Sequence, residues 1–185
     1  MTTLRHGDIL IRPYARDDAD ALYQQVCASR AVLSRWLPWC HAAYSQADAQ
    51  AWIAHCMDSW ERRSEFPFGI FAADGGTLLG GVGLSEISRA HNMANIGYWV
   101  GTAQQGRGIA TRAAARVAYF GFDEARFSRL EIVVAEENRA SRRVAEKLGA
   151  HLEAVARHRI LLHGVPASAA VYSLIPSDVL AGEAT

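Results

Sequence analysis

The spacing of hydrophobic and polar positions changes along the chain and predicts strands and helices in turn. Residues 8–14, DILIRPY, alternate apolar and polar side chains as a half-buried strand does, and Pro13 closes the run. Apolar residues then recur at helical spacing at Ala19, Leu22, Tyr23 and Val26. Asp17 or Asp18 is suited to cap this first helix.

A second helix is predicted over residues 46–63. Its apolar residues share one face: Ala49, Trp52, Ile53, Cys56 and Trp60. Between the two helices, residues 34–45, SRWLPWCHAAYS, are rich in aromatic side chains and interrupted by Pro38. This pattern predicts the end of a helix followed by a loop.

The middle of the chain reads as strands followed by one helix. Residues 66–88 predict two antiparallel strands joined at Asp74-Gly75-Gly76, and residues 93–100, MANIGYWV, predict another strand. A loop over residues 100–105 leads into a helix over residues 107–122. Residues 130–135, LEIVVA, form a continuous apolar run, which is typical of a central strand buried on both faces.

The last part predicts one more helix and two strands. Asn138 can cap a helix that runs to Leu148 and ends at a left-handed Gly149, with Val144 and Ala145 buried. Residues 151–175 then read as two strands around a His163-Gly164 turn. This order of elements, in a chain of 185 residues, predicts one mixed α/β domain over residues 1–185.

Composition narrows the classes of function. The formal net charge is zero, so no overall basic field favours nucleic acid or an anionic membrane as a partner. The sequence contains no apolar run of bilayer length, and residues 1–7 lack the apolar stretch of a signal peptide. Cys27, Cys40 and Cys56 match no metal-binding spacing. We therefore expect a cytoplasmic protein with reduced thiols and no metal.

The glycine-rich stretch YWVGTAQQGRGIATRA, residues 98–113, comes close to two phosphate motifs and meets neither. Gly101 and Gly106 have the spacing of a P-loop, but Arg107 and Gly108 follow in place of Lys and a hydroxyl residue. A dinucleotide fingerprint starting at Gly106 fails at Thr111. A strand, a glycine loop and a helix still present unpaired N–H groups that suit an anchored pyrophosphate. A simple tight turn before a helix is the alternative.

Four segments in order resemble the GNAT superfamily of acetyl-CoA-dependent N-acetyltransferases. Residues 105–110, QGRGIA, fit its Q/R-x-x-G-x-G/A pattern. Residues 8–23, 33–39 and 137–154 resemble the opening strand and helix, the aromatic segment and the second cofactor motif of its ribosomal-protein alanine and serine N-terminal acetyltransferase branch. The resemblance implies an α/β (α+β) fold. It would have a mixed, mostly antiparallel, twisted sheet of about six to seven strands with about four helices.

The resemblance also implies which residues bind acetyl-CoA, the only cosubstrate expected. The backbone amides of the loop would bind the pyrophosphate: Gln105, Gly106, Arg107, Gly108, Ile109 and Ala110. Arg107 and Arg112 could add charge. The strand ending at Val100 would separate from residues 130–135, and an N–H near Val100 would polarise the thioester carbonyl.

Asn138 and Ser141 occupy the matching positions of the second cofactor motif. Ser141 would protonate the departing thiolate, with Tyr172 as the alternative donor. Structural roles, as an N-cap for Asn138 and a first-turn residue for Ser141, are the alternatives.

The general base is predicted to be Glu86, in GLSEIS. The acids that the family commonly has at two other positions are replaced here by Asn95 and Ile160. Other candidates for the base are His91, His158 and Glu153. An N-terminal α-amino group has a pKa of about 7.7–8.0, so a carboxylate acting through water suffices.

The acceptor site is predicted to include Trp36, Trp39 and Glu86. Tyr44, Trp52 and Trp60 belong to the same aromatic region. The predicted reaction transfers an acetyl group to a primary amine by direct attack, and the predicted amine is the N-terminal α-amino group of a peptide or ribosomal protein. A small-molecule amine acetyltransferase and a non-catalytic acyl-CoA sensor are the alternatives. A monomer or a homodimer is expected.

Overall fold

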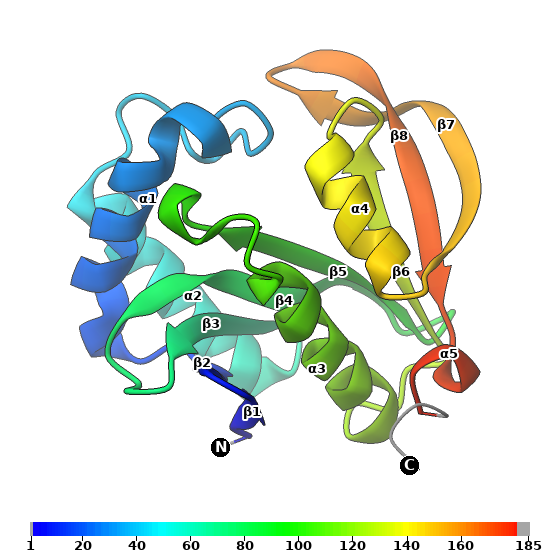
Figure 1. The fold of residues 1–185 in the computed structure, drawn as a ribbon, viewed down its shortest axis with the longest axis horizontal. Helices are drawn as coiled ribbons and strands as arrows, with labels where there is room; N and C mark the ends of the chain where they lie inside the picture. The colour runs from blue at the N-terminus through cyan, green and yellow to red at the C-terminus, as the bar shows by residue number, and fades with distance from the viewer. Residues whose placement is uncertain (1, 181–185) are drawn as a thin grey trace.

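The computed structural model describes residues 2–180, which form one sheet of eight strands in the order β1-β2-β3-β4-β5-β6-β8-β7 (Figure 1). The strands are β1 (Leu4–His6), β2 (Ile9–Pro13), β3 (Phe66–Ala72), β4 (Leu78–Ser88), β5 (Met93–Val100), β6 (Arg129–Ala135), β7 (His151–Leu162) and β8 (Val165–Leu174). The α-helices are α1 (Ala19–Leu33), α2 (Gln46–Arg62), α3 (Ile109–Asp123), α4 (Arg139–Lys147) and α5 (Pro176–Leu180). The mixed α/β class is confirmed, and the short β1 and α5 are additions to the predicted elements.

The helices cover both faces of the sheet. α3 packs on one face, where Ile109, Ala113 and Val117 join a large apolar core with β3–β6. α1 and α2 cover the other face of β2–β4 around a second core (Figure 1). Among residues 2–180, no helix combines the length and the apolar character that crossing a membrane requires.

The N-termini of α1 and α2 differ in whether a side chain caps them. Ser45 caps α2 by accepting a hydrogen bond from the Asp48 N–H, and Asp48 bonds back to the Ser45 N–H. Asp18 precedes α1 but makes no capping bond. Its carboxylate instead accepts from Arg12 at 2.7 Å and from the Ala15 N–H at 2.7 Å. The predicted capping role of Asp18 is therefore wrong.

The two parts of the sheet meet at a short parallel junction. β5 and β6 pair over only Met93–Asn95 and Arg129–Glu131, and their remaining residues are unpaired with each other. All other neighbouring strands are antiparallel. β5 therefore presents an open edge from Ile96 to Val100, as the predicted separation of these strands requires.

Burial along β6 corrects the prediction of a strand covered on both faces. Leu130, Ile132 and Val134 are buried, whereas Glu131 and Val133 are half-buried. α1 and α2 pack against β2–β4, so they leave this second face of β6 partly exposed. Val144 and Leu148 of the α4 segment are likewise half-buried and only Ala145 is buried. The left-handed Gly149 is confirmed at φ 77°.

Candidate active site

The loop between β5 and α3 forms an open backbone cradle. Gly106 and Gly108 have φ values of 75° and 71°, and a Cβ built on either would contact nothing within 4 Å. Gly108 is the N-cap of α3 and provides no side-chain cap. Within the described chain, the N–H groups of residues 106–111 donate to no protein acceptor. These donors and the helix dipole create a site for an anion.

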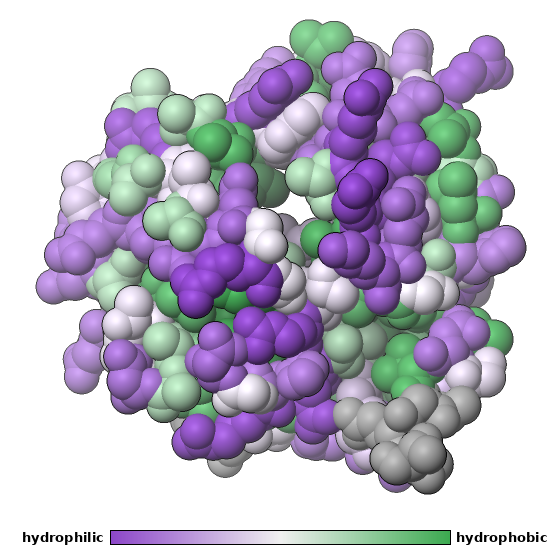
Figure 2. Space-filling model, viewed as in Figure 1, coloured by the Kyte–Doolittle hydropathy of each residue, from purple (hydrophilic) through white to green (hydrophobic). Residues whose placement is uncertain are grey.

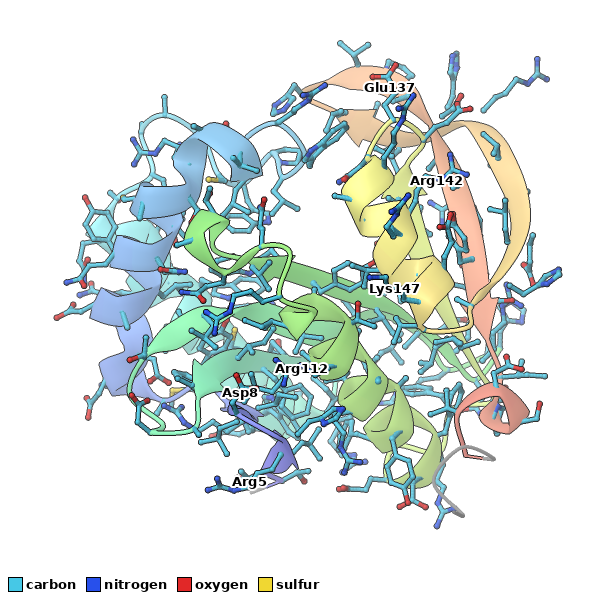
Figure 3. The ribbon with its side chains drawn as sticks, in the orientation of Figure 1. Arg5, Asp8, Arg112, Glu137, Arg142 and Lys147 are labelled. Atoms are coloured by element: carbon cyan, nitrogen blue, oxygen red, sulfur yellow. The ribbon has the colours of Figure 1, made fainter. Side chains whose placement is uncertain are left out.

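The side chains of this loop divide into those that face the cradle and those that do not. Ile109 is buried in the core, so only its backbone faces the loop, whereas Gln105 and Arg107 are exposed. Arg107 donates to the Gln104 amide oxygen at 2.6 Å. Arg112 pairs with Asp8, and Figure 3 shows the two side chains pointing toward each other. The charge of Arg112 is thus offset by Asp8, contrary to the added charge expected from it.

The open edge of β5 carries N–H groups that point into the gap. The Gly101 N–H donates to the Leu79 carbonyl of β4 at 2.9 Å. Successive N–H groups of a strand point to opposite edges, so the N–H groups of Tyr98 and Val100 face away from β4, toward β6. Where pairing stops, the Asn95 Oδ1 accepts from the Val133 N–H at 3.3 Å. Asn95 thus bridges the strands at the base of the opening.

Ser141 lies across this opening from β5. The Asn138 side chain caps α4 by accepting from the Ser141 N–H at 3.2 Å. The Ser141 hydroxyl donates to the Tyr98 hydroxyl at 3.2 Å, and Tyr98 donates to the Ser141 carbonyl at 2.9 Å. Burial raises the pKa of Tyr98 to about 12, so its phenol is neutral at physiological pH. Tyr98 therefore holds β5 to the first turn of α4.

Two other candidates from the sequence are engaged elsewhere. Tyr172 is buried in the core, and its hydroxyl contacts Arg142 at 3.1 Å and Glu146 at 3.4 Å. Glu153 pairs with Arg129 at 2.6 Å, and this contact lowers the pKa of Glu153 to about 2. A carboxylate of such low pKa is a weak base.

A cavity of about 530 Å³ lies on the α1–α2 side of β4 and β5. Its walls include Trp39, Tyr44, Trp52 and Trp99, and Trp39 lies 6.0 Å from Trp99 between ring centroids. Ser85 and Gly97 also line it. Figure 2 shows the surface hollowed between the N-terminal helices and α4, above β5.

The structure brings only some of the predicted acceptor residues to this cavity. Trp39 lines it, whereas Trp36 and Glu86 do not. Glu86 is exposed on a bulge of β4, with φ 50°. Trp60 packs against Phe66 and Phe68 in the core. His91 and His158 are exposed in a turn and on the edge strand β7.

Sequence reasoning missed Tyr98 and Glu65. Glu65, just before β3, lines the cavity and contacts the His55 ring at 3.0 Å. Glu65 belongs to no recognisable motif, and each residue acquires its place through contacts between distant segments. The position of Tyr98 within IGYWV, immediately before the glycine loop, is the one local signal that could have indicated it.

These features fit coenzyme A. The unpaired N–H groups of residues 106–111 suit its pyrophosphate, and the open edge of β5 can pair with its amide-containing arm. Among the described residues, no group of three or more His, Cys, Asp and Glu could hold a metal ion.

The acetyltransferase (GNAT) domain model matches residues 8–151. The chain belongs to the GNAT acetyltransferase family. Enzymes of this family transfer an acetyl group from acetyl-CoA, so the chain is an acetyl-CoA-dependent N-acetyltransferase. The family resemblance seen in the sequence is thereby confirmed.

Individual relatives support the assignment over most of the chain. YjcK of Bacillus subtilis, provisionally named an N-acetyltransferase, is 36% identical over 127 residues, covering 68% of this chain and 70% of YjcK. A Vibrio cholerae structure provisionally described as a ribosomal-protein-serine acetyltransferase is 30% identical, with a TM-score of 0.81 over 95% of this chain and 98% of its own. RimL, a ribosomal L7/L12 α-N-protein acetyltransferase in complex with coenzyme A, shares the fold at 22% identity, with a TM-score of 0.87 over 94% and 98% of the two chains.

Proposed function

We propose that this enzyme acetylates the N-terminal α-amino group of a peptide or protein, such as a ribosomal protein. The observation that carries the proposal is the arrangement of three features along β5: the N–H cradle at one end, the open edge in the middle and the aromatic cavity beside it. The Vibrio cholerae relative supports a ribosomal-protein acceptor.

Acetyl-CoA supplies the acetyl thioester. In the proposed mechanism the amides of Gln105–Ala110 anchor the pyrophosphate, and the Val100 N–H donates to the thioester carbonyl oxygen as negative charge develops there. The amine nitrogen bonds to the carbonyl carbon as the carbon–sulfur bond breaks. Ser141 donates a hydrogen bond or proton to the leaving thiolate, with Asn138 fixing the turn that carries it.

The amine must lose a proton during this step. Glu86 is the proposed acceptor, acting through water from the β4 bulge next to Ser85. Because an α-amino group has a pKa of about 7.7–8.0, part of the acceptor is already neutral at physiological pH, and the demand on the base is modest.

Direct attack agrees with the state of the thiols. Cys40 and Cys56 are buried, and burial raises the pKa of both, which disfavours the thiolate needed for a covalent intermediate. Cys27, half-buried, contacts the Arg30 guanidinium at 3.2 Å on α1.

The test is release of free thiol from acetyl-CoA in the presence of peptides with free N-termini, polyamines and amine antibiotics. Turnover on peptides, with acetylation mapped to the α-amino group by mass spectrometry, is the expected result. Turnover on small amines alone would favour a small-molecule acetyltransferase. Tight acetyl-CoA binding with no turnover on any amine would favour a sensor.

A further inference from the structure

The cavity beside β5 has a floor with one open position. A Cβ built on Gly97 would contact nothing within 4 Å, and the φ of Gly97 lies outside the left-handed region. Gly83, its partner across the β4–β5 pair, differs because a Cβ there would come within 2.9 Å of the Phe66 carbonyl oxygen. Gly83 is thus required by the packing of the sheet, whereas Gly97 leaves space that the protein itself does not fill.

Gly97 also lies on the stretch of β5 that has no β6 partner. Anything placed over Gly97 is therefore adjacent to the open edge, where the reacting carbonyl is proposed to bind. The surrounding rings are partly exposed, with Trp39 at 42% and Trp52 at 43% exposure, so they present apolar surface to an occupant. A side chain resting there would remove both its own apolar area and that of the rings from water.

Carboxylates outnumber basic side chains in the lining of the cavity. Among the described residues that line it, Asp48 and Glu65 are acidic, His41 carries an imidazole, and none is Lys or Arg. Hydrogen bonds from Ser45 lower the pKa of Asp48, so this carboxylate is ionised at physiological pH. Glu65 is near β3, two strand spacings or about 10 Å from β5. An acceptor carboxylate in this space would face two carboxylates, with no Lys or Arg among the described lining residues to pair with it.

We propose that this cavity selects acceptors whose reacting amine stands next to a bulky apolar or aromatic group and that it rejects those with a carboxylate there. The first side chain of an N-terminal peptide would lie over Gly97, between the rings of Trp39 and Trp52. The inference rests on the proposed function and specifies its acceptor class.

The test uses peptides X-Ala-Ala-Gly with X as Phe, Leu, Ser or Asp, and measures kcat/KM at saturating acetyl-CoA. We expect kcat/KM to be higher for the Phe and Leu peptides than for the Ser peptide. The kcat/KM of the Asp peptide should be at least about 10-fold below that of the Phe peptide, the size of effect that one or two side-chain groups produce in a binding pocket. Gly97→Val should lower kcat/KM for the Phe peptide at least about 10-fold by filling the space. The acetyl-CoA dissociation constant should stay unchanged.

Two control variants, Gly76→Val and Glu61→Gln, test whether the effects belong to the cavity. Gly76→Val adds the same side chain at another glycine with open space, in the β3–β4 turn outside the cavity, and should leave kcat/KM for all four peptides unchanged. Glu65→Gln should narrow the gap between the Phe and Asp peptides, whereas Glu61→Gln, exposed on α2, should not.

The outcomes separate this inference from the proposed function. Turnover with equal kcat/KM for all four peptides, or full activity of Gly97→Val on the Phe peptide, would overturn the inference and leave N-terminal acetylation standing. Absence of turnover on every peptide would reject both.

Discussion

Two hydroxyl groups meet across the opening between β5 and α4, and each restricts the other. The Ser141 hydroxyl donates to Tyr98, and Tyr98 donates to the Ser141 carbonyl. In the free protein the Ser141 hydroxyl proton therefore points at the Tyr98 oxygen. When coenzyme A leaves, the Ser141 hydroxyl must turn toward its sulfur, and the bond from Tyr98 to the Ser141 carbonyl keeps the first turn of α4 in place while it does so.

Replacing Tyr98 tests this dependence. Tyr98→Phe removes both hydrogen bonds and should lower kcat about 5- to 10-fold, since one hydrogen bond contributes about 1 kcal/mol. The KM for acetyl-CoA should stay within about twofold because the cradle at residues 106–111 is untouched. Ser141→Ala added to Tyr98→Phe should cause less loss than the two single effects combined, because the residues act as a unit. Additive losses would contradict the pairing, and Tyr119→Phe on α3 serves as the control.

The role of Glu86 as the base also needs a direct test, because its side chain is exposed on a bulge of β4 and does not line the cavity. If its carboxylate receives the amine proton, Glu86→Gln should lower kcat/KM about 10-fold, since part of the amine is already neutral, and should remove the carboxylate's share of the acid limb of the pH–rate profile while the ionisation of the amine itself remains. A pH–rate series from pH 5 to about pH 9 measures both. Unchanged activity with an unchanged acid limb would show that Glu86 is not the base.

At the level of elements, the loop before α3 derives its function from backbone conformation. Gly106→Ala would force a Cβ into a left-handed position at a cost of about 1–2 kcal/mol, although no atom obstructs it. We expect the acetyl-CoA dissociation constant to rise about 5- to 10-fold as the N–H groups shift, which calorimetric titration would measure.

Gly149→Ala provides the matched control. Gly149 has φ 77°, its Cβ would also meet open space, and it lies after α4 rather than in the loop. Both variants should lose similar thermal stability, but only Gly106→Ala should bind acetyl-CoA more weakly. Equal weakening in both would mean that global destabilisation, not the cradle, governs binding.

The elements also show what the sequence could predict. The glycine loop was predicted because its signal is contiguous, and the α1 and α2 segments because their apolar residues recur at helical spacing. The burial of β6 was not predicted, since hydrophobicity does not reveal that α1 and α2 cover β2–β4 and leave one face of β6 partly exposed. Trp39 and Trp36 are equivalent in the sequence, and only the fold places one in the cavity. The position of Glu65 in the cavity wall depends on how the α2–β3 turn packs against the sheet.

At the level of the whole molecule, two parts of one sheet are joined by a three-residue parallel ladder. Arg129 and Glu131 lie within that ladder, and Arg129 also pairs with Glu153 of β7 at 2.6 Å. This ion pair links the outer strand of the C-terminal part to the junction itself.

Acid should weaken this link with a definite sign. Arg129 lowers the pKa of Glu153 to about 2 in the folded protein, whereas an unfolded glutamate has a pKa near 4.3. The pair thus contributes stability above about pH 4, and that contribution is lost as the pH falls toward about 2. Because both side chains are partly exposed, Glu153→Gln should cost less than about 1 kcal/mol at pH 7. Urea unfolding measures the free energy of unfolding of wild type, Glu153→Gln and the exposed control Glu137→Gln (Figure 3). At pH 7 Glu153→Gln should be less stable than wild type, and this difference should disappear in acid. Glu137→Gln should show no such pH-dependent difference. A stability difference between wild type and Glu153→Gln that is the same at every pH would mean that Glu153 contributes through packing rather than through its charge.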